Sequence, residues 1–159
     1  MRVDSVVSVK RVGVFLGGAL ALAACGHRAP DATPEGAVHE LVELMRHVHG
    51  NTGDAKAAYR LISKHAQQNL SMRAQRYSAA SGKAITPGAM IAPTRFLLRF
   101  QPERYTAKIW GTSALVEVLG PSAEERAQVP CVFEDGAWRV DLALPPLPPV
   151  QMRPGRTQP

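Results

Sequence analysis

The chain has 159 residues, 19 Lys and Arg against 13 Asp and Glu, a net charge of +6 and two cysteines. This length fits one domain, and 45% hydrophobic with 20% charged residues can form a packed core, which excludes a wholly disordered or collagen-like chain. Two cysteines are too few for a disulfide-stabilised scaffold, so the fold has to rest on apolar packing.

The first 24 residues have the pattern of an export signal. Three basic residues precede an uncharged apolar run at 12–24, which as a helix would span about 20 Å, too short for a hydrocarbon core of about 30 Å. The sequence LAAC at 22–25 resembles the lipobox of bacterial lipoproteins. This resemblance implies a signal peptide at 1–24, cleavage between Ala24 and Cys25, and lipidation of Cys25 by palmitate-like chains. The alternative is an ordinary secretory signal that ends in cysteine.

An acylated Cys25 makes membrane lipid an expected partner of this protein. Several acyl chains together give durable anchoring. Lipoproteins of double-membraned bacteria with a residue other than Asp after the cysteine usually reach the outer membrane, and here that residue is Gly26. We therefore expect a membrane-anchored lipoprotein of the cell envelope, at the periplasmic face of the outer membrane. Cys131 then has no intramolecular partner, and we expect it to pack as a small buried residue.

Composition divides the chain after the signal peptide into three segments. Residues 25–33 are expected to form a short tether, and 34–144 to fold as one domain. Residues 145–159 contain six prolines in fifteen residues. This Pro-rich tail is either a strand terminator followed by a disordered end or a polyproline II ligand for a groove.

Three helices are predicted in the first half of the domain. Thr33 as cap, followed by Pro34 and an acidic residue, marks a helix start, and apolar residues recur at helical spacing as far as Gly50. We expect a second helix capped by Asp54, and a third at about 65–80. A single short turn is expected at 89–91.

Two antiparallel hairpins are predicted in the second half. Apolar and polar residues alternate at 105–110 and 114–119 around a Gly-containing loop, and again at 127–133 and 138–144. Opposing Phe133 to Trp138 puts the apolar residues of the second hairpin on one face.

The register of the second hairpin depends on Pro130. A two-residue loop would place Pro130 in a hydrogen-bonded pair with Asp141, although proline has no N–H to donate. We therefore expect a four-residue loop at 134–137, or a bulge at Pro130.

Helices followed by consecutive strands predict an α+β fold, with N-terminal helices packed on one side of a curved antiparallel sheet. The stretches TPEGAVHELVELM, AYRLIS and EDGAWRVDLAL resemble small bacterial envelope proteins of the nuclear transport factor 2-like (cystatin and ketosteroid-isomerase) superfamily. The resemblance covers most of 34–144. It implies a cone-shaped fold whose helices and sheet enclose a pocket, used in relatives for catalysis or ligand binding.

No residue pattern points to a catalytic or metal site. The chain after Cys25 lacks the nucleophile, phosphate-binding and paired-cysteine motifs. His39, Glu43 and His47 share one helix face, but that face lies opposite the apolar stripe and is expected to be solvated. Asp141 could act as a buried base, although a surface ion pair with Arg139 is the plainer interpretation. We expect no catalytic residue, no metal and no cofactor.

Charge is strongly segregated along the chain. The segment 55–116 holds ten Lys or Arg against one acid. Either these residues are compensated by acidic neighbours within the fold, or they form a basic face for an anionic surface such as lipid headgroups. Nucleic acid is not an expected partner, because export separates the protein from it. The possible contacts with an anionic surface are Arg60, Lys64, Arg73, Arg76, Arg95 and Arg99.

Together these features predict a lipid-anchored envelope protein with a non-enzymatic binding or accessory role, whose partner is an envelope protein or a small ligand. Two alternatives remain open. One is an isomerase-like or dehydratase-like enzyme that uses the cone pocket and needs a desolvated carboxylate there. The other is a homodimeric or assembly subunit, since members of this superfamily often dimerise through the exposed sheet face.

Overall fold

The computed structural model describes residues 29–49, 51–91, 96, 98–147 and 149. The predicted signal peptide, the cleavage site between Ala24 and Cys25, and the candidate contact Arg95 lie outside the described residues. The same holds for most of the Pro-rich tail.

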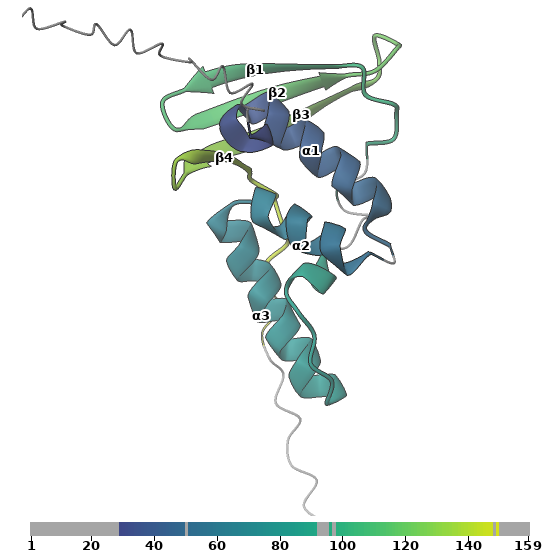
Figure 1. Ribbon diagram of the computed structural model, residues 1–159, viewed down its shortest axis with the longest axis vertical. Helices are drawn as coiled ribbons and strands as arrows, with labels where there is room; N and C mark the ends of the chain where they lie inside the picture. Colours follow the sequence, from purple (N-terminus) through teal and green to yellow (C-terminus); the bar gives the residue numbers. More distant parts are fainter. Residues whose placement is uncertain (1–28, 50, 92–95, 97, 148, 150–159) are drawn as a thin grey trace, which may run out of the picture.

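The fold is α+β, as predicted. Three helices come first and pack against one four-stranded antiparallel sheet of strand order β1-β2-β3-β4. Helix α1 lies across one face of the sheet and contacts all four strands, while α2 and α3 extend from the β4 side (Figure 1). The elements are η1 (Pro30–Ala32), α1 (Pro34–His47), α2 (Thr52–Leu61), α3 (Lys64–Ser81), η2 (Gly88–Met90), β1 (Arg104–Trp110), β2 (Ser113–Leu119), β3 (Arg126–Glu134) and β4 (Ala137–Val140).

Side-chain caps set the helix starts. Thr33 Oγ1 accepts a hydrogen bond from the Gly36 amide at 3.1 Å, as expected for α1. The predicted cap of α2 is wrong: Asn51 Oδ1 accepts from the amides of Gly53 and Asp54, so Asp54 lies inside the first turn. The side-chain oxygen of Asn51 can cap the helix because Asn51 lies two and three residues before the amides that donate to it.

The ends of α3 are also defined by named residues. Ser63 Oγ accepts from the Ala66 amide at its start, and Gly82 ends it with a φ of 68°. A left-handed backbone of this kind suits glycine, which has no Cβ to clash.

The folded part begins before the predicted domain boundary. Residues Pro30–Ala32, expected within a loose tether, form the 3-10 helix η1, which packs on α1 and β4. Asp31 Oδ2 accepts from Arg139 Nη1 in a half-buried ion pair. The expected pair of Arg139 with Asp141 is therefore wrong, because η1 supplies the acid for Arg139.

The pairing predicted for the second hairpin is confirmed, but the predicted length of its loop is wrong. Phe133 opposes Trp138, while Glu134 pairs with Ala137, so the β3–β4 loop has two residues rather than four. Its residues, Asp135 and Gly136, have φ values of 52° and 79°, the geometry that a two-residue hairpin favours.

Pro130 is accommodated by an early end of the strand. The Asp141 N–H donates to the Pro130 carbonyl at 2.8 Å, but β4 ends at Val140 rather than continuing to Leu144. The sheet therefore never requires the N–H that proline lacks, and neither the longer loop nor a bulge is needed.

The core lies between α1 and the inner face of the sheet. Leu41 and Val38 of α1 belong to the same buried cluster as Val116 and Val118 of β2, and these four side chains are fully buried. Cys131 is 1% exposed in this layer, which confirms the expectation that it packs as a small apolar residue.

The Cys131 thiol makes the stability of the fold sensitive to alkaline pH. Burial, followed by the negative charges of Glu35 and Asp141, raises the pKa of this thiol from 9.0 to about 12. An acid whose pKa is raised on folding favours the folded state fully below its unfolded pKa and loses that contribution as pH rises. The window here runs from about pH 9 to about pH 12.

We expect the free energy of unfolding to fall by about 1 kcal/mol between pH 8 and pH 10 from this group. Urea titrations at several pH values measure it. Cys131→Ala should show a shallower fall, and Tyr105, whose pKa is also raised by burial, accounts for part of the remainder. An unchanged pH slope in Cys131→Ala would contradict the assignment.

Candidate functional site

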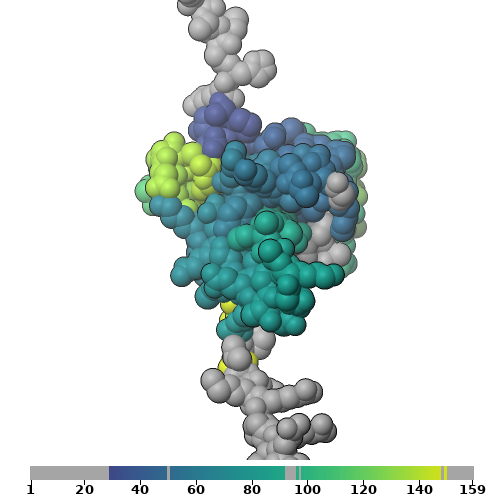
Figure 2. Space-filling model, turned by 60° about the horizontal axis from the view of Figure 1, so that its bottom comes forward, coloured from purple at the N-terminus to yellow at the C-terminus, as the bar shows by residue number. Residues whose placement is uncertain are grey.

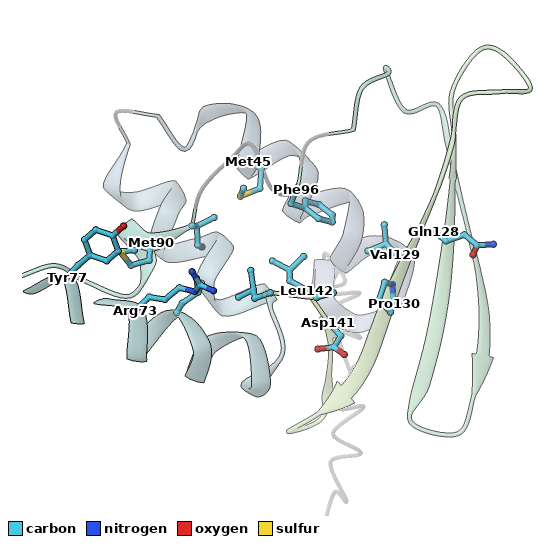
Figure 3. A pocket seen from close by; sticks show the side chains of 14 residues that line it. Met45, Arg73, Tyr77, Met90, Phe96, Gln128, Val129, Pro130, Asp141 and Leu142 are labelled. Carbon is cyan, nitrogen blue, oxygen red and sulfur yellow. The ribbon is translucent and has the colours of Figure 1, made fainter. Parts of the chain in front are cut away.

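A groove opens where α3 and the chain after β4 face strand β3. It encloses a cavity of about 370 Å³, and Figure 3 shows its walls coming from these separate segments. Its floor reaches the core, since Met45, Leu70, Ile91 and Val129 are buried residues that line it. The lining residues are Met45, Leu70, Arg73, Tyr77, Met90, Ile91, Phe96, Gln128, Val129, Pro130, Asp141, Leu142, Ala143 and Leu144.

Arg73 supplies the cationic group of the groove. This half-buried side chain of α3 donates from Nε to Asn69 Oδ1 at 2.7 Å and from Nη2 to the Pro145 carbonyl at 2.6 Å. A guanidinium carries five N–H donors in a fixed plane. The two hydrogen bonds thus orient the group and leave donors that can meet a ligand oxygen.

The opposite wall is the edge of β3 beyond the end of β4. The Asp141 N–H donates to Pro130, so the even-numbered residues of β3 direct their backbone groups toward the β4 side. At Gln128 no β4 residue remains opposite. The Gln128 side chain points away from the cavity (Figure 3), so its backbone forms the wall.

Asp141 is the carboxylate among the described lining residues. Its Oδ1 accepts from Ser63 Oγ at 2.6 Å. Ser63 is itself buried and caps α3 with the same oxygen. This contact joins the start of α3 to the end of β4, so the half-buried Asp141 has a structural partner.

A second hollow lies between the end of α1, α2 and η2. Its volume is about 740 Å³, but none of its lining residues is buried. One polar atom of this hollow, Tyr59 Oη, already bonds to the Gln67 carbonyl and to Ser71 Oγ at 3.2 and 3.0 Å. The smaller groove is therefore the better candidate site.

The predicted basic contacts are dispersed by the fold. Lys64 Nζ donates to Asp135 Oδ1 at 2.8 Å, a hydrogen bond and charge interaction that raise the Lys64 pKa. Arg73, nine residues further on, projects on the opposite side of α3 at 100° per residue. Arg60, Arg76 and Arg99 are exposed. Lys64 is thus paired with an acid, as the charge-compensation alternative expects, whereas the partners of Arg73 described above are neutral oxygens.

The histidine face of α1 is exposed at both predicted positions. His47 Nδ1 lies 3.1 Å from the Glu43 carbonyl, and His39 packs edge-on against Tyr105 with ring centroids 5.2 Å apart. Across the described residues, no group of three or more His, Cys, Asp or Glu side chains is placed to hold a metal ion. Tyr105 Oη is buried without a hydrogen-bond partner among these residues.

Sequence reasoning missed the groove because its walls are far apart along the chain. Leu142 and Leu144 continue the alternating pattern, which predicts a strand, but they line the groove after β4 has ended. The available signal was Pro130, which limits how far β4 can pair.

No protein-family model, curated protein or solved structure matches the chain. Within the described ranges, no helix combines the length and apolar character that crossing a membrane requires.

Proposed function

We propose that this chain is a lipid-anchored binding protein of the bacterial cell envelope, which holds a small, largely apolar ligand in the groove between α3 and β3 without transforming it. Acylated Cys25 anchors it at the periplasmic face of the outer membrane, and the domain is a nuclear transport factor 2-like cone. The observation that carries the proposal is a groove with a buried apolar floor and one oriented guanidinium.

The dimensions and chemistry of the groove favour one class of ligand. A volume of about 370 Å³ falls within the range of small-molecule sites, which combine apolar walls with a few fixed polar groups. Met45, Leu70 and Phe96 offer apolar contact, and Arg73 offers donors for an anionic group. The ligand therefore has an apolar body and a negatively charged end.

The enzyme alternative has less support from the same residues. It needs a desolvated carboxylate in the pocket, with a pKa suited to proton transfer. Asp141 is partly exposed and its Oδ1 is occupied by Ser63. The residues of this groove therefore favour ligand binding over proton abstraction.

Binding of 1-anilinonaphthalene-8-sulfonate to the native protein tests the site, since this probe joins an apolar ring system to a sulfonate. Ala143 is exposed and lines the groove, so we expect Ala143→Trp to weaken the fluorescence titration at least tenfold by filling the mouth. Arg73→Gln should weaken it severalfold through loss of the cation.

Ala89→Trp is the matched control, because Ala89 is also exposed but lines the second hollow. It should leave the titration unchanged. Loss of binding in Ala89→Trp but not in Ala143→Trp would move the site to the second hollow and refute the proposal. Circular dichroism of each variant confirms that the fold is retained.

A further inference from the structure

Three large apolar side chains are exposed at one end of the sheet. Ile109, Trp110 and Phe133 are 54%, 59% and 42% exposed. The other two exposed large apolar residues among those described, Met72 and Tyr77, lie apart from them on α3. We call Ile109, Trp110 and Phe133 the hairpin rim.

The rim surrounds the two hairpin turns. Gly111-Thr112 joins β1 to β2 and Asp135-Gly136 joins β3 to β4, and both turns lie at the same end of the sheet (Figure 1). The Phe133 N–H donates to the Thr112 carbonyl at 2.7 Å, which ties the two turns together.

The rim includes both faces of the sheet. Ile109 opposes Ala114 on the inner face, and Trp110 lies on the outer face. Glu35 of α1 accepts from the Ala107 N–H at 3.1 Å, so the helix begins beside Ala107 and Ile109 extends past it. These side chains therefore project from the end of the molecule.

The described chain begins at this same end. Arg139, which holds Asp31, opposes Val132 in the sheet, one residue before Phe133. Figure 2 shows η1 beside the β3–β4 hairpin, in purple and yellow-green. Asp31 is the sixth residue after Cys25, and even a fully extended segment of that length spans only about 20 Å.

We infer that the hairpin rim is the membrane-contact surface of this protein, with Trp110, Ile109 and Phe133 seated in the interfacial layer of a phospholipid bilayer. The inference rests on the anchor at Cys25 in the proposed function. Trp is suited to this layer because its ring is largely apolar while its N–H can remain hydrated. Lys64 forms an ion pair with Asp135 of the β3–β4 turn, so these two residues together add no net charge to the rim.

A second copy of the chain fits this surface less well. The middle row of the outer sheet face carries Thr106, Glu117 and Gln128 across β1, β2 and β3. Arg104 and Arg126 flank it on either side of Leu119. A homodimer through this face would have to bury these charges, whereas contact at the end of the sheet leaves them in water.

Depth-dependent quenching of tryptophan fluorescence tests the inference. The full chain, purified from membranes of producing cells, is reconstituted into phosphatidylcholine vesicles that contain lipids brominated near the headgroup. Trp138 is buried and should stay unquenched, while we expect at least half of the Trp110 emission to be lost. Trp110→Phe should remove the quenched component, and Ile109→Ser with Phe133→Ser should reduce quenching at least twofold.

Met72→Ser is the matched control, because Met72 is an exposed apolar residue outside the rim; its quenching should equal that of the unaltered chain. Flotation with the vesicles reports on the anchor. A chain that floats with Trp110 unquenched would overturn the membrane contact while retaining the anchor. A chain that does not float would overturn the anchor and the contact that rests on it. Shielding of Trp110 by self-association, seen as a dimer in sedimentation, would also refute the inference.

Discussion

Replacing Ile62 by alanine should lower the free energy of unfolding by about 3 kcal/mol, whereas the same change at Ile109 should alter it by less than about 0.5 kcal/mol. Both substitutions remove the same atoms, so the difference isolates burial. Ile62 is completely buried, and Ile109 is largely in solvent.

The position of Ile62 explains the size of the effect. It lies between α2 and α3 and forms a parallel bridge with Val140 of β4, and the next amide, Ser63 N–H, donates to the Val140 carbonyl at 2.9 Å. The cavity left by alanine would therefore open where the helices join the sheet, a region with little freedom to collapse.

Urea denaturation followed by circular dichroism measures both variants, and the melting temperature of Ile62→Ala should fall by on the order of 10 °C. Equal losses for Ile62→Ala and Ile109→Ala would contradict the packing described here. The variant with Ile109→Ser and Phe133→Ser used in the vesicle experiment is checked by the same denaturation, because Phe133 packs against the buried Trp138 with ring centroids 5.3 Å apart.

Gly36→Ala should destabilise the protein by about 1–2 kcal/mol, although alanine at a helix position ordinarily stabilises by about 1 kcal/mol relative to glycine. A Cβ at Gly36 would lie 2.2 Å from the Pro30 carbonyl oxygen and 3.0 Å from Thr33 Oγ1. Because the closest atom is backbone, η1 has to move and the cap of α1 is strained.

A double-mutant cycle with Asp31→Asn identifies the cause. If Gly36→Ala displaces η1, the Asp31–Arg139 ion pair is already broken in that variant, and Asp31→Asn should then cost nothing more. In the unaltered chain Asp31→Asn should cost about 1 kcal/mol, since the pair is only half-buried. Additive losses would show that the Gly36 effect does not pass through η1.

Local chemistry made the helices and most strand positions predictable. Thr33 and Pro34 mark the start of α1, and Gly82 marks the end of α3, because caps act on backbone groups within a few residues. The alternation of apolar residues likewise gave the pairing of Phe133 with Trp138.

Contacts between distant segments were not predictable in this way. Whether Asp141 bonds to Arg139 or Ser63 depends on where η1 and the start of α3 come to lie. In the sequence, Lys64 is one of ten basic residues in a segment with a single acid. In the fold its ammonium group is paired with Asp135, which lies 71 residues further along the chain. The groove has the same origin, since Arg73 and Val129 meet only after α3 has packed beside the sheet.

The hydrogen bonds from Arg73 and Asn69 to the Pro145 carbonyl hold the C-terminal segment against α3, away from the hairpin turns. The described part of the chain begins beside the hairpin turns. Its C-terminal segment runs alongside α3, where Arg73 contacts it, and Arg73 lies nine residues, or about 14 Å along the helix, from Lys64, which meets Asp135. With Cys25 in a bilayer, the domain acts as a spacer, and a binding partner of the residues after Pro145 would be met at a distance from the lipid surface.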